Sequence, residues 1–487
     1  MAVLLIELNE ATAHFVERFV AEGKLPHFSK MRAEGTVVRT HIPGVAANDP
    51  RFTRKTSPWI VWPSLYTGLR ADAHELLAFG QDTHHLVGKY LWDVLGAAGL
   101  RYGIFGSLNS FPPRPDAAFY VPESLADTAD CIPQRLCSLQ KFFLFGAHHY
   151  SESSLIRFLP AAWALGRASG TAVSLITAAQ AFAQLPLEFA LGEAQRMKRA
   201  MLHSILVADA FTRIYRRTRP DFATVHFNHV AYYQHRYWRA REPERFKREL
   251  SSTDRRFYRD VGERERDEVR YGVTIDRAYV WSDDFIGRMM DMLAPGDTLL
   301  LASGLSQRPY DPAGDIHNPV VRFVQAERFF AALGMDDVCI HYEMNPDLTL
   351  SCAGDARAAD CESIIRDLVW DDGSPLFYCQ RRRHQIFLEF DVPPRVEQQP
   401  DALIRHRSKN DFRASGRDHI WQSPHNEQST AHHDEQGLLY AWRKGTPIKA
   451  ERSDALVTEI APAILAMFGM APCAWHADAA GPLFDIR

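Results

Sequence analysis

The regular alternation of strand-like and helix-like segments constrains the fold of this chain more than any other feature. The N-terminal segment AVLLIEL is typical of a buried strand, and EATAHFVERFVAEG has the apolar spacing of an amphipathic helix that Gly23 can end. TVVRTHI is again strand-like, and KYLWDVLGAAG followed by LRYGIFGSLNS repeats the pattern. Such alternation predicts an α/β fold with a doubly wound, mostly parallel sheet and helices on both faces.

Changes in this pattern divide the chain into five predicted parts. Residues 1–130 form the first part of the α/β core. Strand signals disappear over residues 131–219, which predicts a helical insertion or cap. The core returns over residues 220–330 and ends with residues 401–487. Between them, residues 331–400 carry short strand-like runs, which predict a small α+β subdomain.

The charge balance and the cysteines restrict the class of partner and the compartment. A formal net charge of −4 over 487 residues argues against a nucleic-acid binder, which needs a basic face. Seven scattered cysteines without a C-x-x-C pair indicate reduced thiols, and the N-terminus lacks a signal-peptide pattern, so we expect a cytoplasmic protein. The most apolar run, Thr171 to Gly192, is interrupted by Gln180 and Glu188. It favours a buried helical hairpin over a membrane span.

Polar side chains follow several predicted strands, where a parallel sheet gathers its strand ends and binds ligands. Histidines and carboxylates there could hold a metal. Ser57 precedes a proline, which restricts it to extended backbone, and its hydroxyl could act as a nucleophile. The four polar segments are Glu7-Leu8-Asn9-Glu10, Thr56-Ser57, Asn228-His229 with Gln234-His235, and His432-His433.

The order of these motifs resembles the type I phosphodiesterase and nucleotide pyrophosphatase branch of the alkaline phosphatase superfamily. AVLLIELNE resembles the opening strand of that family, which ends in Asp-Gly. SPWIVWPSLYTGLRADAHEL is similar to its nucleophile segment, with Thr67, Gly68 and His74 in place. HFNHVAYYQHRYW occupies the position of the family's Asp-x-x-x-His stretch. LLLASGLSQ occupies the position of its Ser-Asp-His-Gly motif, and AHHDEQGLLYAWRKG resembles its G-x-H-x-x-x-G motif. The matching segments cover most of the chain in the family's order.

The resemblance implies a first metal site that is damaged. In that family a hydroxyl nucleophile and two zinc-like ions process phosphate esters. His235 and His433 match the two histidines of the first site, but Ala231 stands at the position of its aspartate. It remains possible that these histidines hold a single metal together with His229 or Asn228.

The second metal site of the family is largely missing. Asn9 replaces its first aspartate, and Glu7 and Glu10 are the nearest carboxylates. Gly304 and Leu305 replace its Asp-His pair. We therefore expect one divalent metal, zinc or manganese, or none, and no two-metal site. The candidate metal ligands are His235, His433, His229, Glu7 and Asn9.

The nucleophile position follows from the same resemblance, and polar residues could hold the substrate anion in place of the missing metals. Thr56 or Ser57 lies near the nucleophile position, and Asn109 is the third candidate catalytic residue. The side chains expected to hold the substrate anion are Arg54, Lys55, Asn228 and Gln307.

Three functions stay open at this point. The first is a phosphoester or sulfoester hydrolase or transferase that acts on a small molecule with one metal or none. The second is a catalytically inactive pseudoenzyme that binds an anionic ligand or a protein partner in the cleft that holds the active site in the family. The third is chemistry unrelated to the family on the same fold.

Overall fold

A computed structural model gives the architecture of the chain. The residues that it describes are 1–43, 57–76, 81–124, 126, 128–148, 159–191, 195, 197–247, 249–250, 258–310, 321–323, 325–342, 348–391, 403–408, 412–415, 420–422, 429–476, 478–479 and 481–485. Three predicted site residues, Arg54, Lys55 and Thr56, lie outside the described residues.

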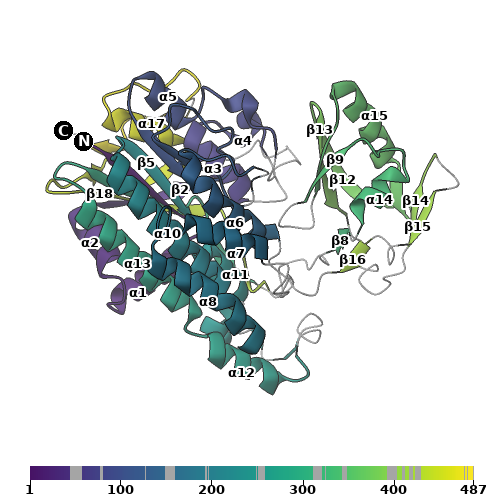
Figure 1. Ribbon diagram of the computed structural model, residues 1–487, viewed down its shortest axis with the longest axis horizontal. Helices are drawn as coiled ribbons and strands as arrows, with labels where there is room; N and C mark the ends of the chain where they lie inside the picture. Colours follow the sequence, from purple (N-terminus) through teal and green to yellow (C-terminus); the bar gives the residue numbers. More distant parts are fainter. Residues whose placement is uncertain are drawn as a thin grey trace.

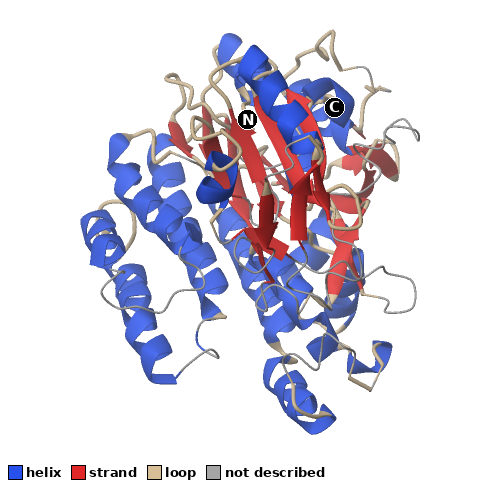
Figure 2. Ribbon diagram, turned by 90° about the vertical axis from the view of Figure 1, so that its right-hand side faces the viewer, coloured by secondary structure: helices blue, strands red, loops and turns tan. Residues whose placement is uncertain are grey.

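An eight-stranded sheet forms the centre of the molecule, in the order β20-β2-β18-β6-β1-β5-β3-β4 (Figures 1 and 2). Only β18 runs antiparallel to its neighbours, β2 and β6, and every other pairing in this sheet is parallel. The prediction of a mostly parallel sheet is confirmed. The strands are β1 (Val3–Leu8), β2 (Thr36–His41), β3 (Tyr102–Phe105), β4 (Phe119–Val121), β5 (Phe222–Phe227), β6 (Thr298–Ala302), β18 (Gln436–Arg443) and β20 (Asp454–Leu456).

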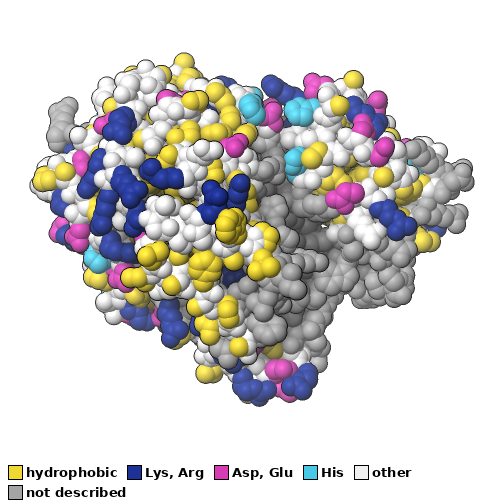
Figure 3. All heavy atoms as spheres, in the orientation of Figure 1, with side chains coloured by type: hydrophobic (Ala, Val, Ile, Leu, Met, Phe, Trp, Pro, Cys, Tyr) yellow, Lys and Arg dark blue, Asp and Glu magenta, His cyan; other side chains and the backbone are white. Residues whose placement is uncertain are grey.

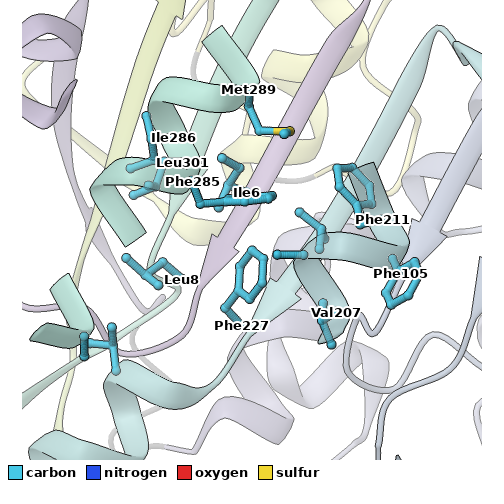
Figure 4. Packing of buried hydrophobic residues seen from close by; sticks show 14 of the residues in the cluster. Ile6, Leu8, Phe105, Val207, Phe211, Phe227, Phe285, Ile286, Met289 and Leu301 are labelled. Carbon is cyan, nitrogen blue, oxygen red and sulfur yellow. The ribbon is translucent and has the colours of Figure 1, made fainter. Parts of the chain in front are cut away.

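Strand β1 is buried along its whole length because helices cover both faces of the sheet. Its alternate residues enter two separate apolar cores: Ile6 and Leu8 pack on one face, and Val3 and Leu5 on the other. Figure 4 shows Ile6 and Leu8 among aromatic and aliphatic side chains of the first core. An apolar run such as VLLIEL therefore buries side chains on both faces of the sheet, as expected of a central parallel strand.

Each face carries its own set of helices, which makes the fold doubly wound (Figure 2). The first face is covered by α1 (Ala13–Ala21), α2 (Pro26–Glu34), α10 (Lys198–Thr218), α11 (His229–Arg241) and α13 (Thr274–Met292). The second face is covered by α3 (Pro58–Thr67), α5 (Leu91–Ala97) and α17 (Ile460–Met467). Peripheral short elements are α4 (Ala71–His74), α12 (Val261–Tyr271), β7 (Ser306–Pro309), β17 (Ala431–Asp434), β19 (Lys449–Ala450) and β21 (Phe484–Asp485).

The helical insertion contains α6 (Cys137–His148), α7 (Leu159–Ala168) and α8 (Leu175–Leu191), and it leads into α10. The apolar run at Thr171 to Gly192 forms most of one helix, α8, and not a hairpin within itself. Its outer side is exposed, with Leu175 at 70% and Ile176 at 75%. The prediction of a buried hairpin is therefore wrong for this segment. Among the described residues, no helix has both the length and the apolar character that a bilayer crossing requires.

A smaller α+β unit with its own core lies beside the sheet domain (Figure 1). It begins with β8 (Val321–Phe323), which pairs with β16 (Ile420–Gln422). We propose bounds of about 321–422 for this unit, wider than the 331–400 predicted from sequence, because this strand pair closes it. Its other elements are α14 (Ala326–Ala331), β9 (Cys339–Tyr342), β10 (Leu348–Ser351), α15 (Asp355–Arg366), β11 (Leu368–Trp370), β12 (Phe377–Arg382), β13 (Gln385–Phe390), β14 (Leu403–His406) and β15 (Arg413–Ser415).

Candidate metal centre

Three side chains from distant parts of the sequence meet at the C-terminal edge of the sheet. Glu10 follows β1, His235 lies in α11, and His433 lies in β17. The Oε2 atom of Glu10 is 3.0 Å from Nε2 of His235 and 3.3 Å from Nε2 of His433. One ligand atom from each residue lies within 4.8 Å of the other two. The two histidines predicted from the motifs are therefore brought together, with Glu10 as their carboxylate.

The backbone of Glu10 is held in an uncommon conformation that aims its side chain at the histidines. Its φ is +60°, the left-handed region that residues with a β-carbon rarely adopt. The backbone N–H of Glu10 donates to the Ser303 carbonyl at 3.0 Å, and the Gln234 side chain donates to the Glu10 carbonyl at 2.8 Å. These bonds from two neighbouring segments offset the strain, which is typical of a functional position.

The two histidines are oriented by their surroundings. Nδ1 of His235 lies 2.9 Å from the carbonyl oxygen of Ala431 and donates to it, so Nε2 is the ring nitrogen that faces Glu10. Strand β17 pairs with β7 so that His433 lies opposite Gln307. Since this register fixes the position of His433 across from the Glu10 loop, the site depends on the pairing of two short strands.

Glu10 is ionised in this environment. Burial acts to raise its pKa, but His433 and His235 oppose that effect by charge and hydrogen bonding, and the pKa stays well below its ordinary value of 4.5. Asn9 donates to Oε1 at 2.9 Å, and the Gln307 amide donates to Oε2. The carboxylate therefore has donors on both oxygens, and its Oε2 atom faces the two imidazoles.

The geometry and the donor set fit one divalent cation. Zinc ligands at about 2.0–2.1 Å in a tetrahedron lie about 3.3 Å from one another. The observed separations from the Glu10 oxygen, 3.0 and 3.3 Å, agree with that spacing. Two imidazoles and one carboxylate suit zinc, and three protein ligands leave a fourth position for a substrate or water. The side chains of His235 and His433 are 32% and 27% exposed, so that position opens toward solvent.

Apolar packing occupies the place where the resemblance put a second metal. The indole N–H of Trp62 donates to Oδ1 of Asn9 at 2.8 Å. Gly304 has φ +71°, and a β-carbon there would lie 3.1 Å from the Trp62 ring. Leu305 is fully buried against Val61. Asn9 thus serves as a hydrogen-bonding partner of an indole, and Glu10, His235 and His433 form the only potential metal cluster within the described parts of the chain.

Glu7, a predicted metal ligand, lies in the protein interior below this site. Tyr66 donates to it at 2.6 Å, Ser107 at 2.7 Å and His226 at 2.9 Å, and the Thr224 hydroxyl also donates. Burial and the nearby Glu7 charge raise the pKa of Tyr66, which keeps the phenol a donor. Both oxygens of Glu7 are therefore occupied by side chains of the sheet and of α3. The structure does not bring Glu7 to the cluster.

His229, another predicted ligand, also lies away from the cluster. Its Nε2 is 3.0 Å from the Ser282 hydroxyl of α13, and the ring packs edge-to-face on Trp281. Burial lowers the pKa of His229 to about 3, so the imidazole is neutral. This histidine joins two helices, and the structure gives it a packing role.

The predicted nucleophile segment begins α3. Ser57 has extended backbone, and its hydroxyl oxygen accepts from the Trp59 N–H at 3.4 Å as the helix cap. The side-chain amide of Asn109 donates to the Trp59 carbonyl at 3.0 Å. Asn109 has φ +52°, and its carbonyl accepts from the Tyr90 hydroxyl at 2.5 Å. The structure therefore places Asn109 beside the first turn of α3, bonded to the carbonyl two residues after the Ser57 cap.

The other predicted anion-binding residues divide between the surface and the interior. Asn228 is exposed at the start of α11, and its Oδ1 accepts from Asn9 at 2.8 Å. Gln307 is buried and donates to Glu10 and to the Ala231 carbonyl, the latter at 3.1 Å. Gln307 therefore positions the carboxylate, and Asn228 keeps an exposed amide next to it.

His74, in the segment that resembles the family, is the last residue of α4 and has a structural role against α3. It is fully buried, its Nε2 is 2.9 Å from the Ser64 hydroxyl, and its Nδ1 accepts from the Leu76 N–H at 3.0 Å. Burial lowers its pKa to about 3, so the ring is neutral. It ties the loop after α3 back onto the helix.

Comparison with known proteins identifies the family of the chain. The model of the type I phosphodiesterase / nucleotide pyrophosphatase family matches residues 3–304, more than half of the chain. A search of curated proteins found no match. Among solved structures, murine ectonucleotide pyrophosphatase / phosphodiesterase 5 is similar at 12% identity and a TM-score of 0.37, with 100% of each chain covered.

Two further solved structures give similar values. Phosphonoacetate hydrolase from Sinorhizobium meliloti, in complex with phosphonoformate, has 12% identity and a TM-score of 0.39, with 95% of this chain and 94% of that chain covered. The alkaline phosphatase PafA has 13% identity and a TM-score of 0.39, with 99% and 98% covered. On the match of the family model, the chain belongs to the type I phosphodiesterase / nucleotide pyrophosphatase family.

Proposed function

We propose that this protein is a phosphoester hydrolase or transferase that uses one divalent cation, zinc or manganese, held by Glu10, His235 and His433. The observation that carries the proposal is the approach of both imidazoles to one ionised oxygen, at 3.0 and 3.3 Å. Membership of the family supports a small-molecule phosphate ester as the substrate. A sulfate ester is the second substrate class, because it presents the same tetrahedral oxygens.

The cation would supply a Lewis acid that polarises the ester and offsets its negative charge. Ser57, or Thr56 before it, supplies the hydroxyl nucleophile at the amino end of α3. The partial positive charge of a helix amino terminus favours the anionic ester at that point. Asn109 orients the first turn of α3 through the Trp59 carbonyl, and the exposed Asn228 amide is available to an ester oxygen.

A ligand-binding pseudoenzyme is the alternative, and a specific observation favours it. Trp62 and Leu305 fill the region of the second metal, so a substrate would meet one cation where the family uses two. Two cations stabilise both the attacking and the leaving oxygen, and the loss of one removes part of that stabilisation. The alternative predicts binding of phosphate-like anions without turnover.

Metal content and turnover test the proposal together. Protein purified without chelators should contain about one zinc or manganese per chain, and it should hydrolyse bis(p-nitrophenyl) phosphate. His433→Ala should lose both properties, whereas His41→Ala, an exposed histidine paired with Asp454, should keep both. Metal without turnover of any phosphate or sulfate ester would favour the pseudoenzyme. Absence of metal from the wild type would contradict the proposed site.

A second pair of variants tests whether Glu10 has taken over the role of the missing aspartate. Ala231 lies one turn before His235 in α11 and is buried. Glu10→Ala should lose the metal, and Glu10→Ala combined with Ala231→Asp should regain it. Failure of the second variant to regain metal in a folded protein would mean that α11 does not face the cation at this position.

The nucleophile is tested by separate substitutions. Thr56→Ala and Ser57→Ala should leave metal content unchanged, because neither hydroxyl is among the three ligands. The variant that lacks the nucleophile should lose most of its kcat, and the other variant should keep the kcat of the wild type. Equal activity of both variants would mean that another group, or water, attacks the ester.

We also propose that the protein works in a reducing compartment, the cytoplasm. All seven cysteines are free thiols in the structure, and four of them are buried. Thiol alkylation in freshly lysed cells should label seven cysteines after denaturation without a reductant. Fewer labelled thiols would indicate disulfides and contradict this localisation.

A further inference from the structure

The outer side of α7 and α8 exposes an apolar surface that the proposed chemistry does not use. On α7, Trp163 is 71% exposed and Leu159 is 64% exposed. On α8, Leu175 is 70% and Ile176 is 75% exposed, and Phe182 and Leu187 are each more than two-fifths exposed. We name these six residues the α7–α8 face. Exposed apolar patches of this kind mark interaction sites in soluble proteins.

The exposed side of α8 carries no charged residue among its described side chains. The acidic residue of this helix, Glu188, is buried and pairs with Arg199 at 2.6 Å. A solvent-facing helix normally carries charges on its outer side. Its exposed side chains are instead Leu175, Ile176, Ala179, Gln180, Phe182, Ala183, Pro186, Leu187 and Ala190.

The helical insertion and the helix α10 that follows it are together basic. Residues 131–219, which include α10, contain eleven Lys and Arg and four Asp and Glu, a net charge of +7, although the whole chain has −4. Arg167 is exposed one helical turn after Trp163, and Arg213 donates to the Gly170 carbonyl at 3.0 Å in the turn that leads to Leu175. Figure 3 shows the hydrophobic and the basic side chains side by side over this part of the molecule.

We propose that the α7–α8 face docks on an anionic lipid surface. Apolar side chains with a basic surround are the pattern of helices that lie in the membrane interface, where burial of Trp, Phe and Leu adds to attraction by acidic lipids. A second copy of the chain is the weaker candidate, because two copies of the 131–219 segment, each of net charge +7, repel each other. The inference does not rest on the proposed function.

Packed helices connect this face to the candidate metal centre. α8 packs against α10, and the Tyr233 hydroxyl of α11 joins the start of α10 by accepting from Met201 at 3.2 Å and donating to the Met197 carbonyl at 3.0 Å. α11 also carries His235. The face and the metal centre therefore belong to one packed body of helices.

Vesicle flotation with the full chain tests the docking. The probes are vesicles of phosphatidylcholine alone and vesicles with about 30 mol% phosphatidylglycerol. The wild type should float with the anionic vesicles and not with the neutral ones. Trp163→Glu combined with Ile176→Glu should bind at least about tenfold more weakly, because both side chains face solvent and the charges oppose insertion.

A matched control separates the face from added charge in general. Val269 is 85% exposed on α12, away from the insertion, and Val269→Glu should float like the wild type. Circular dichroism should be the same for all variants, since each replaced residue is exposed. Absence of the wild type from anionic vesicles, or equal binding of the double variant, would overturn the proposal. A dimer seen by light scattering that the double variant dissociates would also overturn it in favour of a second copy.

Discussion

The charge on Glu10 should make the stability of the metal-free protein depend on pH, and Glu10→Gln should remove this dependence. Glu10→Gln keeps the size and one accepting oxygen of the side chain. It removes the charge that faces His235 and His433 at 3.0 and 3.3 Å. Loss of one member of a buried ion pair costs about 3–5 kcal/mol. Since the two histidines are partly exposed, we expect about 2–3 kcal/mol at neutral pH.

The sign of the pH dependence follows from the lowered pKa of Glu10. A carboxylate with a depressed pKa stabilises the folded state above its unfolded pKa, near 4.5, and loses that contribution as the pH falls through the folded value. The deficit of Glu10→Gln should therefore be full at neutral pH. It should shrink by about 1.4 kcal/mol for each pH unit below 4.5.

Calorimetry in the presence of a chelator measures this effect. With an unfolding entropy of about 1 kcal/mol/K for a chain of this length, the deficit corresponds to a melting temperature about 2–3 °C lower at neutral pH. Glu244→Gln, an exposed carboxylate, should not change the melting temperature. An equal deficit at pH values above and below 4.5, or none at neutral pH, would refute the pairing of Glu10 with the two histidines.

Three further predictions concern the surroundings of the site. Glu7→Gln should destabilise the fold by about 3–5 kcal/mol in calorimetry, because the buried carboxylate holds four donors, and an unchanged melting temperature would contradict that role. Gly304→Ala should cost about 1–3 kcal/mol more than Gly296→Ala in urea unfolding, since both glycines have positive φ but only Gly304 lies against Trp62; equal costs would mean that the indole does not fill this region. His229→Asn should leave metal content unchanged by mass spectrometry, and a folded variant without metal would return His229 to the ligand set.

The fold class and the family could be predicted from the sequence because their signals are local. The run VLLIEL of β1 and the amphipathic pattern after it each report how one segment is buried, and their alternation is enough to predict a sheet covered on both faces. His235 and His433 were identified for a similar reason, since residue type and motif order carry that information. The loss of the second metal site was also visible in the sequence, as Gly304 and Leu305.

Which carboxylate completes the cluster was decided only by tertiary structure. Glu7 and Glu10 flank the same strand end, and their order in the sequence does not tell which one reaches the histidines. The left-handed turn at Glu10 and its bond to Ser303 direct that side chain to the cluster, while Glu7 remains inside the sheet. His229 lies six residues before His235, about 240° around the helix axis, so the two could not share a face.

The apolar surface of α8 is a second feature that the sequence alone did not determine. The run from Thr171 to Gly192 has the composition of a buried segment, and its sequence predicts burial. Burial requires a partner element, and the described helices α7 and α10 cover only one side of α8. Local pattern thus determined that the segment is helical and apolar, whereas the packing of distant segments determined which of its sides stays exposed.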